Sequence, residues 1–191
     1  MEKRMKNQSK LTFFCRENVV LNTLPVAQFR QLPHIETEDE LTAKQLFEQR
    51  KALILACSDV SKTEFDTLSV PDFNQLYDDI CDMILQPSDA LQGAPLNGAS
   101  AEFTLLYPFD NEVGETIHKV TFAIPKVAHS EALADINEAQ AREDFMFEVI
   151  TGLQPSDLHF LSINDYLALK PQVGAFFQQS AAYFRPMTSK A

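Results

Sequence analysis

The sequence predicts an α+β protein that is predominantly helical and contains two tandem units, each a β-hairpin followed by a small helical bundle. A helical segment occurs twice: EFDTLSVPDFNQLYDDICDMI from Glu64 to Ile84, and DLHFLSINDYLALKPQVGAFF from Asp157 to Phe177. Two β-rich runs precede helical spacing in each half. A stretch rich in Pro, Gly and Ser, QPSDALQGAPLNGASA, separates the halves.

The repeated segment aligns without a gap, and most of its apolar positions match. Identical residues pair Leu68 with Leu161, Ser69 with Ser162, Asp72 with Asp165, and Leu76 with Leu169. Self-similarity at a fixed spacing is typical of a small unit copied in tandem. We therefore expect one unit at 1–85, a linker at 86–101, a second unit at 102–184 and a tail at 185–191.

In the first unit, runs at 11–14 and 19–24 predict a short hairpin. A capping box at Thr37–Glu40 predicts the start of a helix that ends near Cys57, with Leu46, Leu53, Ile54 and Cys57 on its core face. Ser61 and Glu64 cap a short helix. The last helix follows Ser69.

In the second unit, the runs EFTLLY and HKVTFAI flank turn chemistry at Asn111 and Gly114, which predicts a hairpin. Helical spacing from about 130 to 150 predicts one helix that ends at Gly152. Pro155 fits the first turn of a short helix. A final helix follows Ser162, and Pro171 in its interior should kink or split it.

The two Ser-Asp pairs are best interpreted as helix caps. A Ser at the N-cap accepts a hydrogen bond from the third helical amide, and an acid at that position favours the helix dipole. We therefore assign Ser69, Asp72, Ser162 and Asp165 as structural caps.

The composition argues against several functions. The net charge is -11, with 27 acidic and 16 basic residues, and nucleic-acid binding requires a basic surface. Three cysteines without CxxC spacing and four histidines without HxxxH spacing predict no metal site or disulfide framework. Phosphate-loop and GxSxG motifs are absent from the sequence. We therefore expect no cofactor and no enzymatic activity.

The chain also contains no signal-peptide pattern and no apolar run of membrane-spanning length. It is therefore expected to be a soluble cytoplasmic protein without membrane contacts.

Aromatic residues are concentrated near the C-terminal end. A unit this small cannot bury all of them, and an exposed remainder would mark a partner surface. The candidate partner-binding residues are Phe160, Tyr166, Phe176, Phe177, Tyr183 and Phe184.

Residues 102–178 resemble the tail assembly chaperones of contractile-tailed bacteriophages. The resemblance lies in the EFTLLYPF strand, the second strand ending in AIPK, the acidic helix, and FEVITGLQPSDLHFLSINDYLALKPQVGAFF. Residues 11–85 are then a divergent second copy, with Cys57–Val60 in place of Ile150–Leu153.

The resemblance implies a non-enzymatic role in phage or prophage tail assembly. Such chaperones bind the tape measure protein, keep it soluble and recruit tail tube subunits. They act in the host cytosol and are absent from the mature virion. The resemblance leaves homo-oligomer formation open.

Two other classes remain open at this point. The net charge also suits an acidic inhibitor or DNA mimic that blocks a basic partner. A structural tail or head adaptor retained in the virion is the other alternative.

Overall fold

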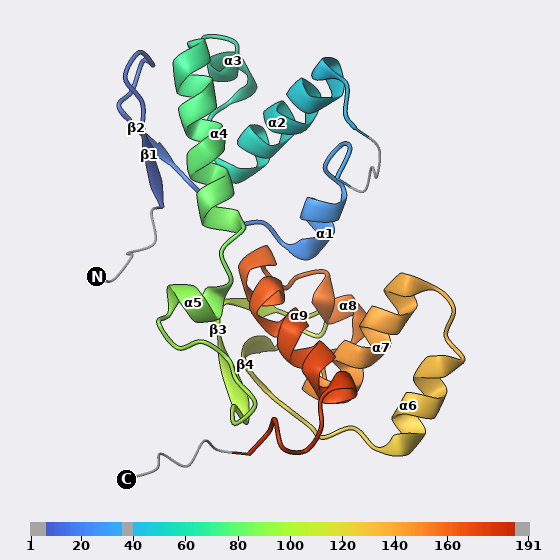
Figure 1. The fold of residues 1–191 in the computed structure, drawn as a ribbon. Helices are drawn as coiled ribbons and strands as arrows, with labels where there is room; N and C mark the ends of the chain where they lie inside the picture. The colour runs from blue at the N-terminus through green and yellow to red at the C-terminus, as the bar shows by residue number, and fades with distance from the viewer. Residues whose placement is uncertain (1–6, 36–39, 186–191) are drawn as a thin grey trace. The chain divides into compact units, whose positions relative to one another are not determined.

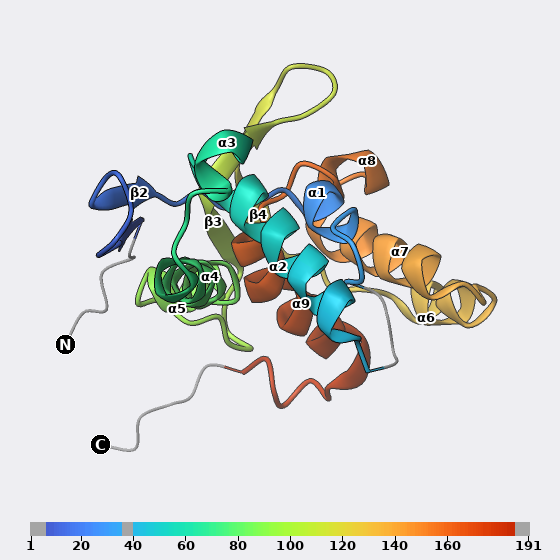
Figure 2. The ribbon, with the colours of Figure 1, turned by 90° about the horizontal axis from the view of Figure 1, so that it is seen from above.

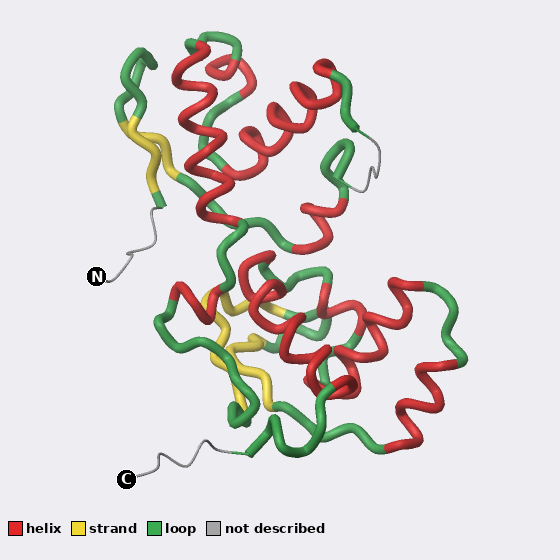
Figure 3. Tube along the Cα trace, viewed as in Figure 1, coloured by secondary structure: helices red, strands yellow, loops and turns green. Residues whose placement is uncertain are grey.

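The computed structural model describes residues 7–35 and 40–185, which form two compact units (Figure 1). Unit 1 comprises Met1–Gln86 together with Ser162–Asn164, and unit 2 comprises Pro87–Leu161 together with Asp165–Ala191. About 48% of the residues are helical, and the two small sheets are antiparallel hairpins, so the predicted α+β class is confirmed (Figure 3). Residues 186–191 of the predicted tail at 185–191 lie outside the described residues.

Unit 1 begins with a hairpin in which Ser9 pairs with Val19. Its elements are β1 (Gln8–Lys10), β2 (Asn18–Val20), α1 (Val26–Arg30), α2 (Ala43–Cys57), α3 (Lys62–Phe65) and α4 (Val70–Ile84). Helices α2 and α4 pack together. Their buried apolar side chains are Leu53, Ile54, Cys57, Leu76, Ile80, Met83 and Ile84.

Helix α2 differs from its prediction at both its start and its face. Positions 37–39 of the predicted capping box lie outside the described residues. The described helix begins after Thr42, whose side chain accepts from the Gln45 amide in a capping box. Leu46, predicted to face the core, is exposed because the first turns of α2 extend beyond the part that contributes to the core.

Unit 2 begins with a helix in the stretch predicted as a linker. Its elements are α5 (Ser88–Leu91), β3 (Glu102–Asp110), β4 (Thr116–Thr121), α6 (Val127–Ala134), α7 (Ala139–Thr151), α8 (Pro155–Leu158) and α9 (Ile163–Gln178), the first two residues of α9 belonging to unit 1. Gly152 ends α7 in the left-handed region, at φ 73°, as predicted. Helix α9 continues through Pro171 and is not split.

The single helix predicted near 130–150 is two helices, α6 and α7, which contact each other (Figure 2). Two side chains stabilise the break between them. The carboxylate of Glu138 accepts from the amides of Gln140 and Ala141 and so starts α7. The Arg142 guanidinium donates to the carbonyls of Leu133 and Ile136 at the end of α6. These groups satisfy the free ends of both helices.

In each unit, a buried aspartate in the first turn of the last helix binds two successive backbone amides of the hairpin. Asp72 accepts from Thr12 at 2.8 Å and Phe13 at 3.0 Å. Asp165 accepts from Leu106 at 2.9 Å and Tyr107 at 3.0 Å, and the Ser88 hydroxyl donates to it at 2.6 Å.

These contacts explain why the strands differ from the predicted runs. In unit 1 the hairpin ladder ends at Lys10, so the predicted run 11–14 is not a strand. In unit 2 the register between β3 and β4 is irregular between Thr104 and Phe109. At both places the amides bond to a carboxylate, and they are therefore unavailable to the neighbouring strand.

Other hydrogen bonds recur in the two units. At the end of α2 and at the end of α7, a hydroxyl donates to a carbonyl of the helix and accepts from the amide two residues further along the chain. In unit 1 the Ser58 hydroxyl donates to the Ile54 carbonyl and accepts from the Val60 amide. In unit 2 the Thr151 hydroxyl donates to the Phe147 carbonyl and accepts from the Leu153 amide. An amide just after each hairpin also donates to a carbonyl at the end of the same helix. The Asn22 amide donates to the Cys57 carbonyl of α2, and the Ala123 amide donates to the Ile150 carbonyl of α7.

The Asp165→Asn variant tests the role of the buried carboxylate. The substitution replaces one acceptor oxygen with an NH₂ group that faces a buried donor. We expect unit 2 to be destabilised by about 3 kcal/mol, because unsatisfied buried donors cost about that much. Urea unfolding followed by circular dichroism measures the effect. Asp135→Asn, at an exposed position, is the matched control, and equal midpoints for the two variants would contradict the proposed role.

Candidate partner-binding site

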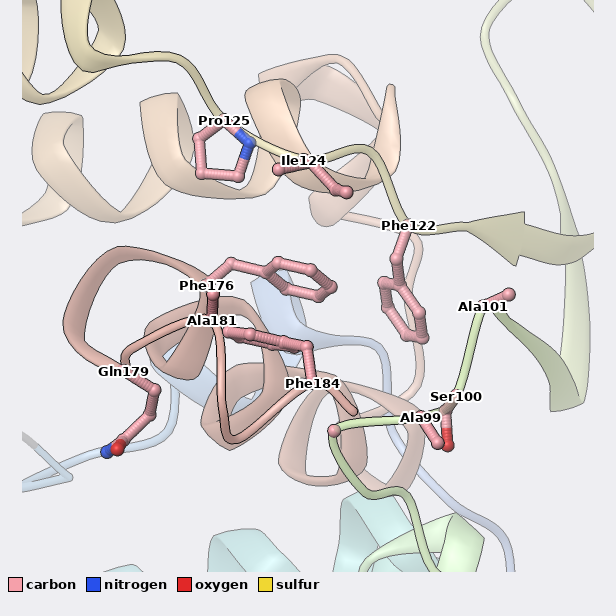
Figure 4. A pocket seen from close by; sticks show the side chains of 11 residues that line it. Ala99, Ser100, Ala101, Phe122, Ile124, Pro125, Phe176, Gln179, Ala181 and Phe184 are labelled. Carbon is pink, nitrogen blue, oxygen red and sulfur yellow. The ribbon is translucent and has the colours of Figure 1, made fainter. Parts of the chain in front are cut away.

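Unit 2 contains an apolar cavity of about 500 Å³ (Figure 4). It is lined by Gly98, Ala99, Ser100, Ala101, Phe122, Ile124, Pro125, Phe176, Gln179, Ala181 and Phe184. None of these lining side chains carries a formal charge. Ligand cavities in proteins have a similar size and are mostly apolar, so this cavity suits apolar side chains of a partner.

Three aromatic rings form one side of the cavity. Phe122 directly follows β4, Phe176 comes from α9, and Phe184 comes from the turn after α9. The Phe176 and Phe184 rings stack with centroids 4.6 Å apart, and the Phe122 ring lies 5.9 Å from that of Phe176. Figure 4 shows Ile124 and Pro125 across the cavity from this stack. The rings hold one another in place and present an apolar wall.

The buried aspartate of α9 determines where Phe176 points. Phe176 follows Asp165 by 11 residues, which is close to three turns of an α-helix, so both lie on nearly the same helix face. Asp165 binds the β3 backbone on that face. Phe176 therefore meets the end of the same hairpin, at Phe122.

A close backbone approach sets the edge of the cavity. A Cβ atom on Gly98 would lie 2.0 Å from the carbonyl oxygen of Tyr183. Only glycine permits this approach between the segment before β3 and the turn that carries Phe184.

The structure brings two of the predicted partner-binding residues, Phe176 and Phe184, into the cavity. Tyr183 lines a smaller cavity of about 140 Å³ with Leu96 and Gln172. Phe160 is exposed and stacks on Phe109 with centroids 6.4 Å apart. Phe177 is half-buried and does not line the 500 Å³ cavity.

Tyr166 lies in the core of unit 2. Its ring stacks on Phe147 with centroids 5.7 Å apart, and its hydroxyl donates to Glu143 at 2.5 Å. Lys170 donates to the Tyr166 hydroxyl at 2.9 Å and pairs with Glu143 at 2.7 Å. Burial, and then the hydrogen bond to Glu143, raises the pKa of Tyr166.

Sequence reasoning did not select the other residues that line the cavity. The sequence pattern predicts a strand at Phe122 and Ile124 and a linker at 98–101. Their apolar character was visible, but a strand pattern does not show which side chains remain exposed beyond the last ladder pair.

The four residues predicted as caps lie in the following contacts. Ser69 caps α4 by accepting from the Asp72 amide at 3.1 Å. Asp72 and Asp165 also bind the hairpins, as described above. Ser162 is buried and forms an isolated β-bridge with Pro25 inside unit 1. These contacts are all structural.

Among the described residues, no cluster of His, Cys, Asp and Glu is suited to a metal ion, and no helix is long and apolar enough to cross a membrane. The three cysteines are free thiols. Burial raises the pKa of Cys57 to about 12, which keeps that thiol protonated and unreactive at neutral pH.

Residues 102–178 match the family model described as phage tail assembly chaperone proteins, E, or 41 or 14. The match begins at the first residue of β3 and ends at the last residue of α9. It confirms the resemblance predicted for this segment. It does not include residues 1–101, so the divergent first copy stays a prediction. Comparisons with curated proteins and with solved structures found no match.

Two glycine variants test the cavity edge. We expect Gly98→Ala to displace the turn at 181–184, because its methyl group would collide with the Tyr183 carbonyl. Faster amide hydrogen exchange in that turn measures the displacement. Gly174→Ala is the control: it meets no atom within 4 Å and should stabilise α9 by up to about 1 kcal/mol. Unchanged exchange in Gly98→Ala would contradict the close approach.

The Tyr166→Phe variant tests the buried hydroxyl through the pH dependence of stability. Burial lowers the pKa of Lys170, but its contacts with Glu143 and Tyr166 outweigh this, so the pKa values of both Tyr166 and Lys170 are raised. A pKa that is higher in the folded than in the unfolded protein stabilises the fold at pH values below the unfolded pKa, about 10. This stabilisation is lost as pH rises through the folded pKa.

We therefore expect wild-type stability to fall at alkaline pH, and to fall less steeply in Tyr166→Phe, where only Lys170 of the pair still titrates. Urea midpoints measured from about pH 8 to about pH 11 provide the comparison. Identical slopes would show that the hydroxyl is not buried as described.

Proposed function

We propose that the protein is a phage or prophage tail assembly chaperone that binds the tape measure protein and keeps it soluble during tail assembly. The family match at 102–178 supports a role in phage tail assembly and a phage tail protein as partner. The observation that carries the finer proposal is the apolar cavity in unit 2, since Phe122, Ile124, Pro125 and Phe176 lie inside the matched segment.

The cavity suits an amphipathic helical partner. Such a helix places apolar residues on one face at intervals of three and four, and proteins bind it by inserting those residues into an apolar groove. The tape measure protein, implied by the family resemblance, is long and helical. In this proposal its apolar side chains contact the Phe122, Phe176 and Phe184 rings, and tail tube subunits are a second partner.

The acidity of the chain fits this role. A net charge of -11 keeps a loaded complex soluble, because like-charged complexes repel one another. In this proposal the protein acts in the host cytosol, has no catalytic activity, and is absent from the mature virion.

A DNA mimic would need its carboxylates on the surface, at phosphate-like spacing. Several carboxylates of this chain are buried instead. Asp72, Asp79, Asp157 and Asp165 accept hydrogen bonds inside their own units. Their placement favours a structural role for part of the negative charge and therefore favours the chaperone over the mimic.

We also propose that the two units are copies of one ancestral unit. The aspartate contacts, the hydroxyl contacts after α2 and α7, and the contact after each hairpin recur between equivalent residues. Hydrogen bonds repeated at equivalent positions support common descent more strongly than the four identities of the repeated segment.

Co-expression with the tape measure protein of the same phage tests the proposed function. We expect the wild-type chain to keep the tape measure protein soluble and to co-purify with it. Phe184→Ala should weaken binding about 30-fold, as the loss of an interface hot spot worth about 2 kcal/mol does. Calorimetry with a soluble tape measure fragment measures this loss.

Val113→Asp is the control for that experiment, since Val113 is exposed, lies in the matched segment and does not line the cavity. It should bind like wild type. A tape measure protein that stays insoluble beside the wild-type chain would contradict the proposed partner. Wild-type affinity in Phe184→Ala would contradict the proposed site.

A further inference from the structure

Unit 1 contains a contact between the segment after its hairpin and the start of α9. Pro25 and Ser162 form an antiparallel β-bridge, and the Ile163 amide donates to the Leu24 carbonyl at 2.8 Å. The apolar side chains at this contact are buried: Val26 is 1% exposed and Ile163 is 4% exposed. Backbone pairing and apolar burial together make it a defined interface.

The repeat supplies a second copy of each side of this contact. Val70 and Ile163 are the first residues of α4 and α9, so Ser69–Pro71 corresponds to Ser162–Asn164. Val26 and Val127 are the first residues of α1 and α6, so Pro125–Val127 corresponds to Leu24–Val26. The equivalent hydrogen bonds from the Asn22 amide to Cys57 and from the Ala123 amide to Ile150 support this alignment, because they make Asn22 equivalent to Ala123.

The equivalent residues in these second copies are exposed. Val70 is 72% exposed where Ile163 is 4% exposed, and Val127 is 86% exposed where Val26 is 1% exposed. Ile124, next to Pro125, is 82% exposed. Each chain therefore presents one exposed copy of each side of an interface that it also contains in assembled form.

We propose that these two exposed segments bind each other between chains, so that the protein associates head to tail. Residues 124–127 of one chain dock on Ser69–Pro71 of the next. The Val70 amide lies in the first turn of α4, where a helix provides no acceptor, and it donates to the Pro125 carbonyl as Ile163 donates to Leu24. Val127 and Val70 are buried together.

Head-to-tail contacts of this kind leave one free segment of each type at the two ends, so assembly continues to an open chain or closes as a ring. The inference rests on the proposed tandem copies. It does not depend on the identity of the tail protein partner.

The contact between chains is weaker than the one inside unit 1. Asn164 donates to the carbonyls of Met83 and Gln86, each at 2.8 Å, and accepts from Thr23. Pro71 occupies the equivalent position and has no side-chain amide. Association is therefore reversible and depends on concentration.

Sedimentation velocity of the full chain over a range of concentrations tests the proposal, with Val70→Asp and Val127→Asp each blocking one segment. We expect the wild-type sedimentation coefficient to rise with concentration, and each variant alone to stay monomeric. A 1:1 mixture of the two variants should form a dimer and nothing larger, because only one complementary pair of segments remains intact. Val113→Asp, equally exposed but outside both segments, should behave like wild type.

A wild-type chain that stays monomeric at all concentrations would overturn the proposal. So would association that neither variant abolishes, or a mixture without the dimer. Ile124 and Pro125 line the 500 Å³ cavity, whereas Val70 and Val127, the two residues that the variants change, do not. Calorimetry of both variants with the tape measure fragment therefore separates failure of self-association from failure of the proposed function.

Discussion

One interaction organises each unit: a buried carboxylate in the first turn of the last helix accepts two successive amides of the hairpin. Asp72 does this in unit 1 and Asp165 in unit 2. The carboxylate satisfies hairpin amides that lack a partner in the neighbouring strand, and it lies at the positive end of the helix dipole. It therefore fixes the hairpin and the last helix with a single side chain. The position of Phe176, three turns further along α9, follows from it.

The same arrangement explains how an acidic protein can present an apolar site. Part of its negative charge is buried as hydrogen-bond acceptors, and the lining of the cavity carries no charged side chain. Other described acids, such as Asp78, Asp82 and Glu112, are exposed. The protein thus buries its structural carboxylates and leaves apolar residues such as Ile124 and Val127 exposed.

Local signals in the sequence predicted the class of the fold, the Gly152 cap and the last helix of each half. They failed where a distant group decided the local structure. The run 11–14 looks like a strand, but the Asp72 carboxylate 60 residues away takes two of its amides. The break between α6 and α7 depends on Arg142 reaching back to α6. At the site, Phe176 and Phe184 were predicted from their aromatic character, whereas Phe122 and the close approach at Gly98 depend on tertiary packing.

The central claim is that the cavity beside the α9 aromatic residues is the surface that binds the tape measure protein. Hydrogen–deuterium exchange of the full chain, alone and bound to the tape measure protein, tests it most directly. We expect binding to slow exchange in 98–101, 122–125 and 176–184 together. Unchanged exchange in these three segments, with protection elsewhere in the chain, would contradict it.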